Sequence, residues 1–107
     1  MAHAQPQFLY LTTTGRRTGL PRKIEIWFTT RRGRYYLVAE HGQRANWVRN
    51  IRAEPRVGFR VGNQTYHGHA RVVTAGAEPT LAAAVRRLSE KKYGWGRGLV
   101  VELVGVE

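Results

Sequence analysis

The segment TTTGRRTGLPRK, at positions 12–23, combines residue types that bind phosphate and carboxylate groups. It contains no acid and four cations, which are Arg16, Arg17, Arg22 and Lys23. Glycines let backbone N–H groups approach an anion, threonine hydroxyls add hydrogen bonds, and arginines supply pairs of charge-assisted bonds. The segment lacks the GxxxxGK[ST] spacing of a P-loop. It therefore predicts an anion-binding loop, and the alternative is a solvent-exposed basic turn.

Histidines at three positions offer acid–base or metal-binding chemistry. His67 and His69 lie two apart on an expected strand, so both side chains project from one face. The chain has no cysteine, and no third ligand is evident, so the sequence does not predict a metal site. His41 precedes Gly42 at the end of an expected strand, where it could touch a ligand or simply form a turn.

Three aromatic residues are candidates for ligand contact. Tyr93 and Trp95 belong to the glycine-rich stretch YGWGRG, where we expect them to line the mouth of a site or contact a flat ligand. Trp47 has helical spacing with Ile51, which by itself favours packing in the core. No Ser-His-Asp set or carboxylate pair can be assembled, so any enzyme activity would borrow its chemistry from a cofactor.

The composition limits the classes of protein to consider. A chain of 107 residues predicts one domain, residues 1–107, with one modest core. The net charge of +11 suits a phosphate, nucleic acid, an anionic lipid or a polyanionic cofactor, and charge alone does not choose among them. The absence of cysteine is compatible with a reducing cytoplasm, and no apolar run approaches the roughly 18 residues of a membrane span.

The hydrophobic pattern predicts about six strands and two helices. We expect strands at Phe8–Thr14, Arg22–Thr30, Tyr35–Glu40, Arg56–Val61, Gln64–Thr74 and Leu99–Val106. We expect helices at Ala45–Ala53 and Glu78–Lys92. Residues 22–40 should form one hairpin, and Gly62-Asn63 suits the turn of a second. Because the strands do not alternate regularly with helices, the pattern predicts a mainly β (α+β) fold with an antiparallel barrel.

Three motifs together carry a resemblance to a known family. They are TTTGR-x-[ST]-G-x-PR, then W-x-x-N-[IL]-R-A-x-P, then V-x-V-G, in this order over Phe8–Val73. This combination resembles the deazaflavin (coenzyme F420)-dependent nitroreductase family. That family lies in the split β-barrel superfamily, which also contains flavin-binding proteins similar to pyridoxamine-phosphate oxidase. The resemblance implies a split antiparallel β-barrel.

The resemblance also assigns roles to individual residues. It implies that the phosphate and acidic tail of F420 are held by Thr14, Arg16, Arg17, Thr18, Gly19, Arg22 and Lys23. It implies that the deazaflavin ring is bordered by Val38, Ala39, Glu40, His41, Asn46 and Trp47. Tyr93 and Trp95 fall where relatives place aromatic residues near the substrate, and Tyr93 or His41 could supply a proton. Glu40 departs from the family pattern, which has a small or hydroxyl residue there.

By this resemblance, the expected activity is transfer of a hydride from reduced F420 to a quinone- or nitroaromatic-like acceptor. The resemblance also implies a homodimer. Three alternatives stay open: the same fold binding FMN, a nucleic-acid-binding β-barrel without catalysis, and a ligand carrier without turnover. The TTTGRRTGLPRK segment has a more specific explanation in F420 than in nucleic acid.

Overall fold

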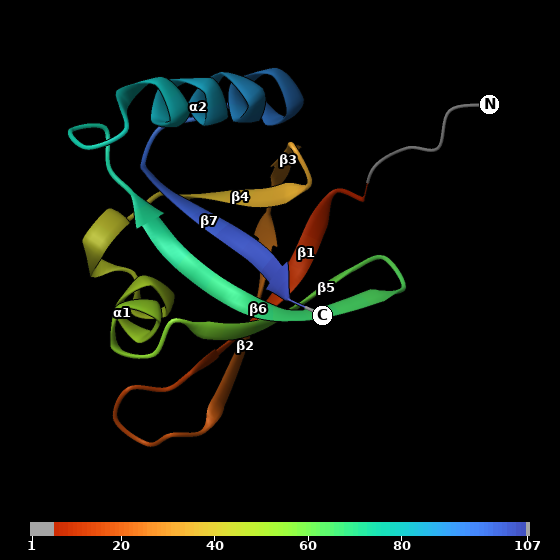
Figure 1. Ribbon diagram of the computed structural model, residues 1–107, viewed down its shortest axis with the longest axis vertical. Coiled ribbons are helices and arrows are strands. Elements are labelled where there is room, and N and C mark those ends of the chain that lie inside the picture. Colours follow the sequence, from red (N-terminus) through yellow and green to blue (C-terminus); the bar gives the residue numbers. More distant parts are fainter. Residues whose placement is uncertain (1–5, 107) are drawn as a thin grey trace.

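The computed structural model describes residues 6–106. Seven strands form a curled sheet, and one of the two α-helices lies over it (Figure 1). The strands are β1 (Phe8–Thr14), β2 (Pro21–Trp27), β3 (Thr29–Arg31), β4 (Arg34–Ala39), β5 (Arg56–Val61), β6 (Gln64–Val73) and β7 (Leu99–Val106). The helices are α1 (Asn46–Ala53), α2 (Pro79–Tyr93) and the short 3₁₀ helix η1 (Gly42–Arg44).

The strands form one antiparallel sheet in the order β2-β1-β5-β6-β7-β4-β3. The sheet curls around a core to which both of its ends contribute, with Ile24 and Ile26 of β2 packed in the same cluster as Leu37 of β4. Alternate residues of the strands, such as Leu9 and Leu11, point into this core. The expected mainly β, split-barrel architecture is confirmed.

The predicted strand at residues 22–30 is wrong, because the chain breaks at Phe28 into β2 and β3. The backbone N–H of Phe28 donates to the Tyr93 hydroxyl at 3.0 Å, and its carbonyl accepts from Lys92 Nζ at 2.9 Å. Phe28 therefore bonds to the end of α2 instead of to a neighbouring strand. As a result β2 pairs with β1 and only β3 pairs with β4, so the expected hairpin over residues 22–40 is reduced to β3–β4.

Helix α2 covers the outer face of the sheet over β7, β4 and β3 (Figure 1). A second, smaller core forms there from Val85 of the helix and Tyr36, Val73 and Val100 of the strands. Residues 100–103 of β7 are consequently buried on both faces of the sheet, with Val101 and Leu103 in the main core. The predicted hairpin turn at Gly62-Asn63 is confirmed, since Val61 pairs with Gln64 and Gly62 has a φ of +59°.

A buried carboxylate lies beside this second core. Glu102 of β7 is 2% exposed and accepts hydrogen bonds from the Tyr36 hydroxyl and from Arg71 Nε, both at 2.8 Å. Arg34 adds a contact at 3.3 Å. Burial by itself raises the pKa of this carboxyl, but the bonds from Arg71 and Tyr36 outweigh it and hold the pKa of Glu102 below its usual value.

We predict that Glu102→Gln lowers the free energy of unfolding at pH 7 by about 2–3 kcal/mol. This is less than for a fully buried pair, because the guanidinium groups of Arg34 and Arg71 are half exposed. A carboxyl with a depressed pKa stabilises the fold above its unfolded pKa, and the effect is lost as pH falls through the folded pKa. Urea denaturation at several pH values should show the difference shrinking in acid.

Glu90→Gln on α2 is the control, because Glu90 is exposed and forms no ion pair within residues 6–106. Equal losses for Glu102→Gln at neutral and acid pH would mean that the carboxylate charge does not stabilise this network.

Candidate functional site

A pocket of about 580 Å³ opens where the end of β4 meets β2 and the start of α1. Its lining is Phe8, Glu25, Ile26, Trp27, Val38, Ala39, Glu40, His41, Ala45, Trp47 and Trp95. We call this the tryptophan pocket. Its volume lies in the range of small-molecule and cofactor sites, and most of its lining is apolar or aromatic, as such sites usually are.

The tryptophan pocket gathers most of the residues that sequence analysis assigned to ring and substrate contact. The end of β4 contributes Val38 and Ala39, and the turn after it contributes Glu40 and His41. Trp47 of α1 and Trp95 after α2 also line it, whereas the predicted Asn46 does not and instead lies 3.4 Å from the Arg16 guanidinium. The predicted residues that line the pocket lie up to 57 positions apart in the chain, so only the curled sheet brings them together.

Tyr93 does not line the tryptophan pocket, and its expected position in a connection is wrong, since it is the last residue of α2. Its ring stacks on Trp27 with centroids 4.5 Å apart. Its hydroxyl lies 2.6 Å from the carbonyl of Gln7 and 2.8 Å from that of Phe28, and burial raises its pKa. Tyr93 therefore supports the Trp27 ring by stacking on it, while Trp27 itself lines the pocket.

The basic segment forms a tight loop between β1 and β2. The N–H of Gly15 donates to the carbonyl of Leu20, and the N–H of Gly19 donates to the carbonyl of Gly15, both at 2.8 Å. Gly19 has a φ of +74°, a conformation that favours glycine. The Thr18 hydroxyl accepts from the N–H of Leu20 at 3.2 Å. Thr18 and Gly19 thus shape the turn, while Arg17 is exposed on it.

Arg16 is anchored to α1 through a residue that sequence analysis did not select. The buried amide oxygen of Asn50 accepts from the backbone N–H of Arg16 at 3.2 Å and from its guanidinium at 3.0 Å. The amide nitrogen of Asn50 donates to the Thr13 hydroxyl at 3.1 Å, and Asn46 lies 3.4 Å from the guanidinium. The sequence did contain a sign of this role, because Asn50 is the asparagine of the W-x-x-N motif and stands next to the apolar Ile51.

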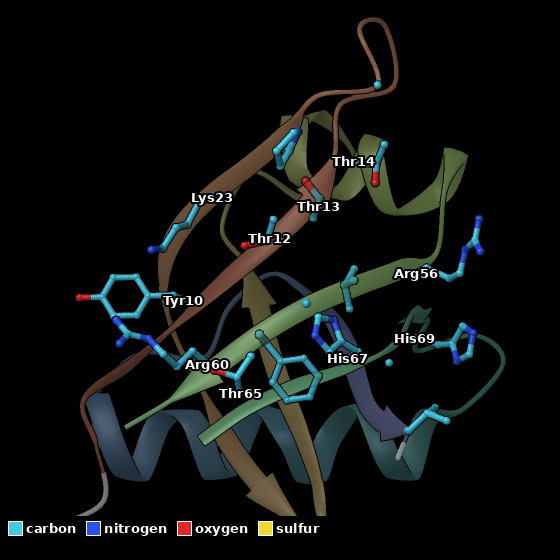
Figure 2. A pocket seen from close by; sticks show the side chains of 17 residues that line it. Tyr10, Thr12, Thr13, Thr14, Lys23, Arg56, Arg60, Thr65, His67 and His69 are labelled. Atoms are coloured by element: carbon cyan, nitrogen blue, oxygen red, sulfur yellow. The ribbon is translucent and has the colours of Figure 1, made fainter. Parts of the chain in front are cut away.

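The sheet divides the predicted anion-binding residues between its two faces. Arg22 pairs with Thr13, whose side chain bonds to Asn50, so Arg22 shares the face of β2 that is turned toward α1. Lys23 pairs with Thr12 and points to the opposite face. Lys23, Thr14 and Gly19 line a second hollow there, shown in Figure 2.

This second hollow, of about 760 Å³, is an open basic groove on the outer face of β1, β5 and β6 (Figure 2). Two cations lie over the ring of Tyr10: Lys23 Nζ is 5.0 Å and Arg60 Cζ is 4.8 Å from the ring centroid. His67 and His69 also line the groove, as their predicted shared face requires. Within residues 6–106, no three histidine, cysteine or acidic side chains are grouped as a metal site.

Among residues 6–106, no helix is long and apolar enough to cross a membrane.

Comparison with a protein family gives a match over nearly the whole chain. The family of F420H(2)-dependent quinone reductase matches residues 2–99. The match includes the basic loop, the end of β4, all of α1 and Trp95. No curated protein sequence matches the chain.

Solved structures share the fold at low sequence identity. An F420-H2 dependent reductase is 20% identical with a TM-score of 0.77, covering 97% of this chain and 99% of its own. A putative pyridoxamine 5'-phosphate oxidase from Listeria innocua is 15% identical with a TM-score of 0.74, covering 95% and 86%. A protein described as a domain-swapped dimer is 20% identical with a TM-score of 0.67, covering 97% and 84%. These likenesses confirm the fold.

We predict that Asn50→Leu lowers the free energy of unfolding by about 1–3 kcal/mol, because it leaves the Arg16 N–H and the Thr13 hydroxyl without their partner. Hydrogen exchange of the Gly15 and Gly19 amides should also accelerate, since the loop loses its anchor. Chemical denaturation and exchange mass spectrometry measure the two effects.

Asn46→Ala provides a matched control on the same helix. Asn46 is exposed and contacts Arg16 only at 3.4 Å, so its loss should cost less than about 0.5 kcal/mol. Similar losses for the two variants would argue against the Asn50 anchor.

Proposed function

The chain belongs to the F420H(2)-dependent quinone reductase family, and from this premise we propose that it passes a hydride from reduced F420 to a quinone- or nitroaromatic-like acceptor. As a family member it is an oxidoreductase with coenzyme F420 as its cofactor. One observation carries the proposal. Helix α1 joins the two parts that such a cofactor needs, because Trp47 lines the tryptophan pocket and Asn50, three residues later, holds Arg16 of the basic loop.

The residues present fit a cofactor with a flat ring and an acidic tail. Val38, Ala39 and Trp47 offer apolar and aromatic surface against which a ring can pack. Arg16 and Arg22 lie on the α1 side of the β1–β2 hairpin and can bind phosphate or carboxylate oxygens in pairs. Arg17, exposed on the same loop, adds charge. We assign Lys23 and Thr14 a weaker role, because they face the basic groove.

When bound, reduced F420 supplies the hydride. The chain contributes position: α1 and the end of β4 fix the ring, the basic loop holds the tail, and the tryptophans provide apolar surface in the pocket. A quinone also needs a proton after the hydride has moved. His41 lines the pocket with an exposed ring and can donate that proton from its imidazole, whereas the Tyr93 hydroxyl is already bonded to backbone carbonyls.

We further propose that the chain acts as a homodimer in the cytoplasm. A structure of the same fold is described as a domain-swapped dimer. Strands β2 and β3 are the two edges of the sheet, and edges of this kind are often covered by a second chain. Sedimentation velocity measured with and without F420 tests the oligomeric state.

The first functional prediction concerns the cofactor. We expect F420 to bind in the micromolar range or more tightly, to bind better than FMN, and to dissociate more readily as salt rises, because cations hold its tail. Protein-bound reduced F420 should then be oxidised by menadione, as followed by cofactor absorbance. Tighter binding of FMN, or no oxidation by any quinone or nitroaromatic, would contradict the proposal.

The second functional prediction separates the two faces of β2. Arg22→Gln and Lys23→Gln remove the same charge from adjacent residues, yet we expect only Arg22→Gln to weaken F420 binding strongly, by about tenfold or 1–2 kcal/mol. Arg22→Lys should resemble Arg22→Gln, because lysine keeps the charge but cannot form two parallel bonds. Binding is measured by fluorescence titration.

The melting temperature of the cofactor-free protein should barely change in the Arg22 variants, because the side chain of Arg22 forms no hydrogen bond or ion pair with residues 6–106. If Lys23→Gln weakens binding as much as Arg22→Gln, then the tail is not confined to the α1 side of the hairpin.

A further inference from the structure

The tryptophan pocket has an unusual aromatic content. All three tryptophans of the chain, Trp27, Trp47 and Trp95, line it, together with Phe8. They come from β2, α1 and the connection after α2, so the tertiary structure concentrates them. Trp27 is 45% exposed and is held by its stacking on Tyr93, which leaves much of its surface open to a ligand.

The charge of the tryptophan pocket is opposite to that of the protein. The chain has 18 lysines and arginines and only seven acids, yet the lining contains two acids, Glu25 and Glu40, and no lysine or arginine. Glu25 forms no ion pair with residues 6–106, and Glu40 has only His41, 4.0 Å away. Two carboxylates are thus available in an aromatic pocket.

Aromatic faces combined with carboxylates recognise organic cations. The face of a tryptophan ring attracts a cation through the negative charge of its π system, and a nearby carboxylate attracts it directly by its charge. The arginines and lysines elsewhere on the protein repel such a cation, but salt screens charges more than about 8–10 Å away. Lys92 is close enough to act, because its Nζ lies 5.0 Å from the centroid of the Tyr93 ring on which Trp27 stacks, so the two carboxylates of the lining must outweigh its repulsion.

Building on the proposed function, we infer that the preferred acceptor is a flat organic cation with a delocalised charge, such as an N-alkylated azaarene. Such a molecule presents a planar face to the tryptophans and its charge to Glu25 and Glu40. Because Val38, Ala39 and Trp47 are assigned to the cofactor ring, the acceptor surface is formed by Glu25, Trp27 and Trp95, with Glu40 beside it.

The redox step with a cationic acceptor balances without a proton donor. A C–H bond breaks on the reduced cofactor, its electron pair and hydrogen form a C–H bond on an electron-poor ring carbon, and the acceptor loses its positive charge. The cofactor is oxidised by two electrons, and the acceptor is reduced by two. The oxidised cofactor would release one proton from its ring nitrogen to solvent, which balances the charge lost by the acceptor. An acceptor that needs no proton suits this pocket, because Tyr93 does not line it and the one histidine in its lining, His41, is turned largely to solvent.

The test compares N-methylacridinium with acridine, two flat molecules of nearly the same shape, at a pH where acridine is neutral. Isothermal titration calorimetry is run on the protein loaded with oxidised F420 and on the cofactor-free protein. We expect the cation to bind at least tenfold more tightly. Glu25→Gln and Glu40→Gln should each reduce that ratio several-fold, and the double variant should nearly abolish it. Glu90→Gln, an acid outside the pocket, should leave it unchanged.

The turnover measurement uses reduced F420 with N-methylacridinium and with neutral menadione. We expect the larger kcat/KM for the cation, with the preference lost in Glu25→Gln/Glu40→Gln. Equal binding of the acridines, or a preference that survives in the double variant, would overturn the inference. Failure of F420 to bind would instead overturn the proposed function, while the cofactor-free titration would still decide the cation preference. Turnover of menadione without any preference for the cation would contradict this inference and leave the proposed function standing.

Discussion

The hydrogen bonds made by the backbone of Phe28 hold the two ends of the sheet in place. Phe28 bonds to Tyr93 and Lys92 at the end of α2, although it lies 65 residues from Tyr93 in the chain. At this point the chain leaves β2 at one end of the sheet and enters β3 at the other. Crossing the open side of the barrel would otherwise leave buried backbone groups unsatisfied, which is costly. The tryptophan pocket depends on the same crossing, because Trp27 precedes Phe28 and stacks on Tyr93.

Helix α1 is the second structural link, and it connects the pocket to the basic loop. Its eight residues are too few for a stable isolated helix, so packing and side-chain bonds must hold it. Val48 and Ile51 supply the packing in the main core, and Asn50 supplies bonds to Thr13 and Arg16. A shift of α1 would move Trp47 and Arg16 together. The ring-binding and anion-binding parts of the site are therefore positioned as one unit.

The charges of the protein are separated by function as well as by position. The loop and the outer groove are basic, with no acid in the lining of the groove, while the tryptophan pocket has two acids and no lysine or arginine. An anionic cofactor tail and a cationic or neutral acceptor would thus be attracted to different surfaces of the protein. Glu102, by contrast, lines neither surface, and its buried carboxylate is bonded to Arg34, Arg71 and Tyr36.

The sequence by itself determined the local elements and the chemical character of the loop. Strand alternation, the Gly62-Asn63 turn and both helices followed from patterns over a few neighbouring residues, and the motifs around Arg16 and Trp47 identified the family. Only the tertiary structure decided that the strand breaks at Phe28, that the face of β2 carrying Arg22 is turned toward α1, and that Tyr93 supports Trp27 instead of lining the pocket. These features depend on pairing and packing between residues far apart in the chain. No periodicity within a single segment records those contacts, and the same holds for the gathering of three tryptophans and two glutamates in one pocket.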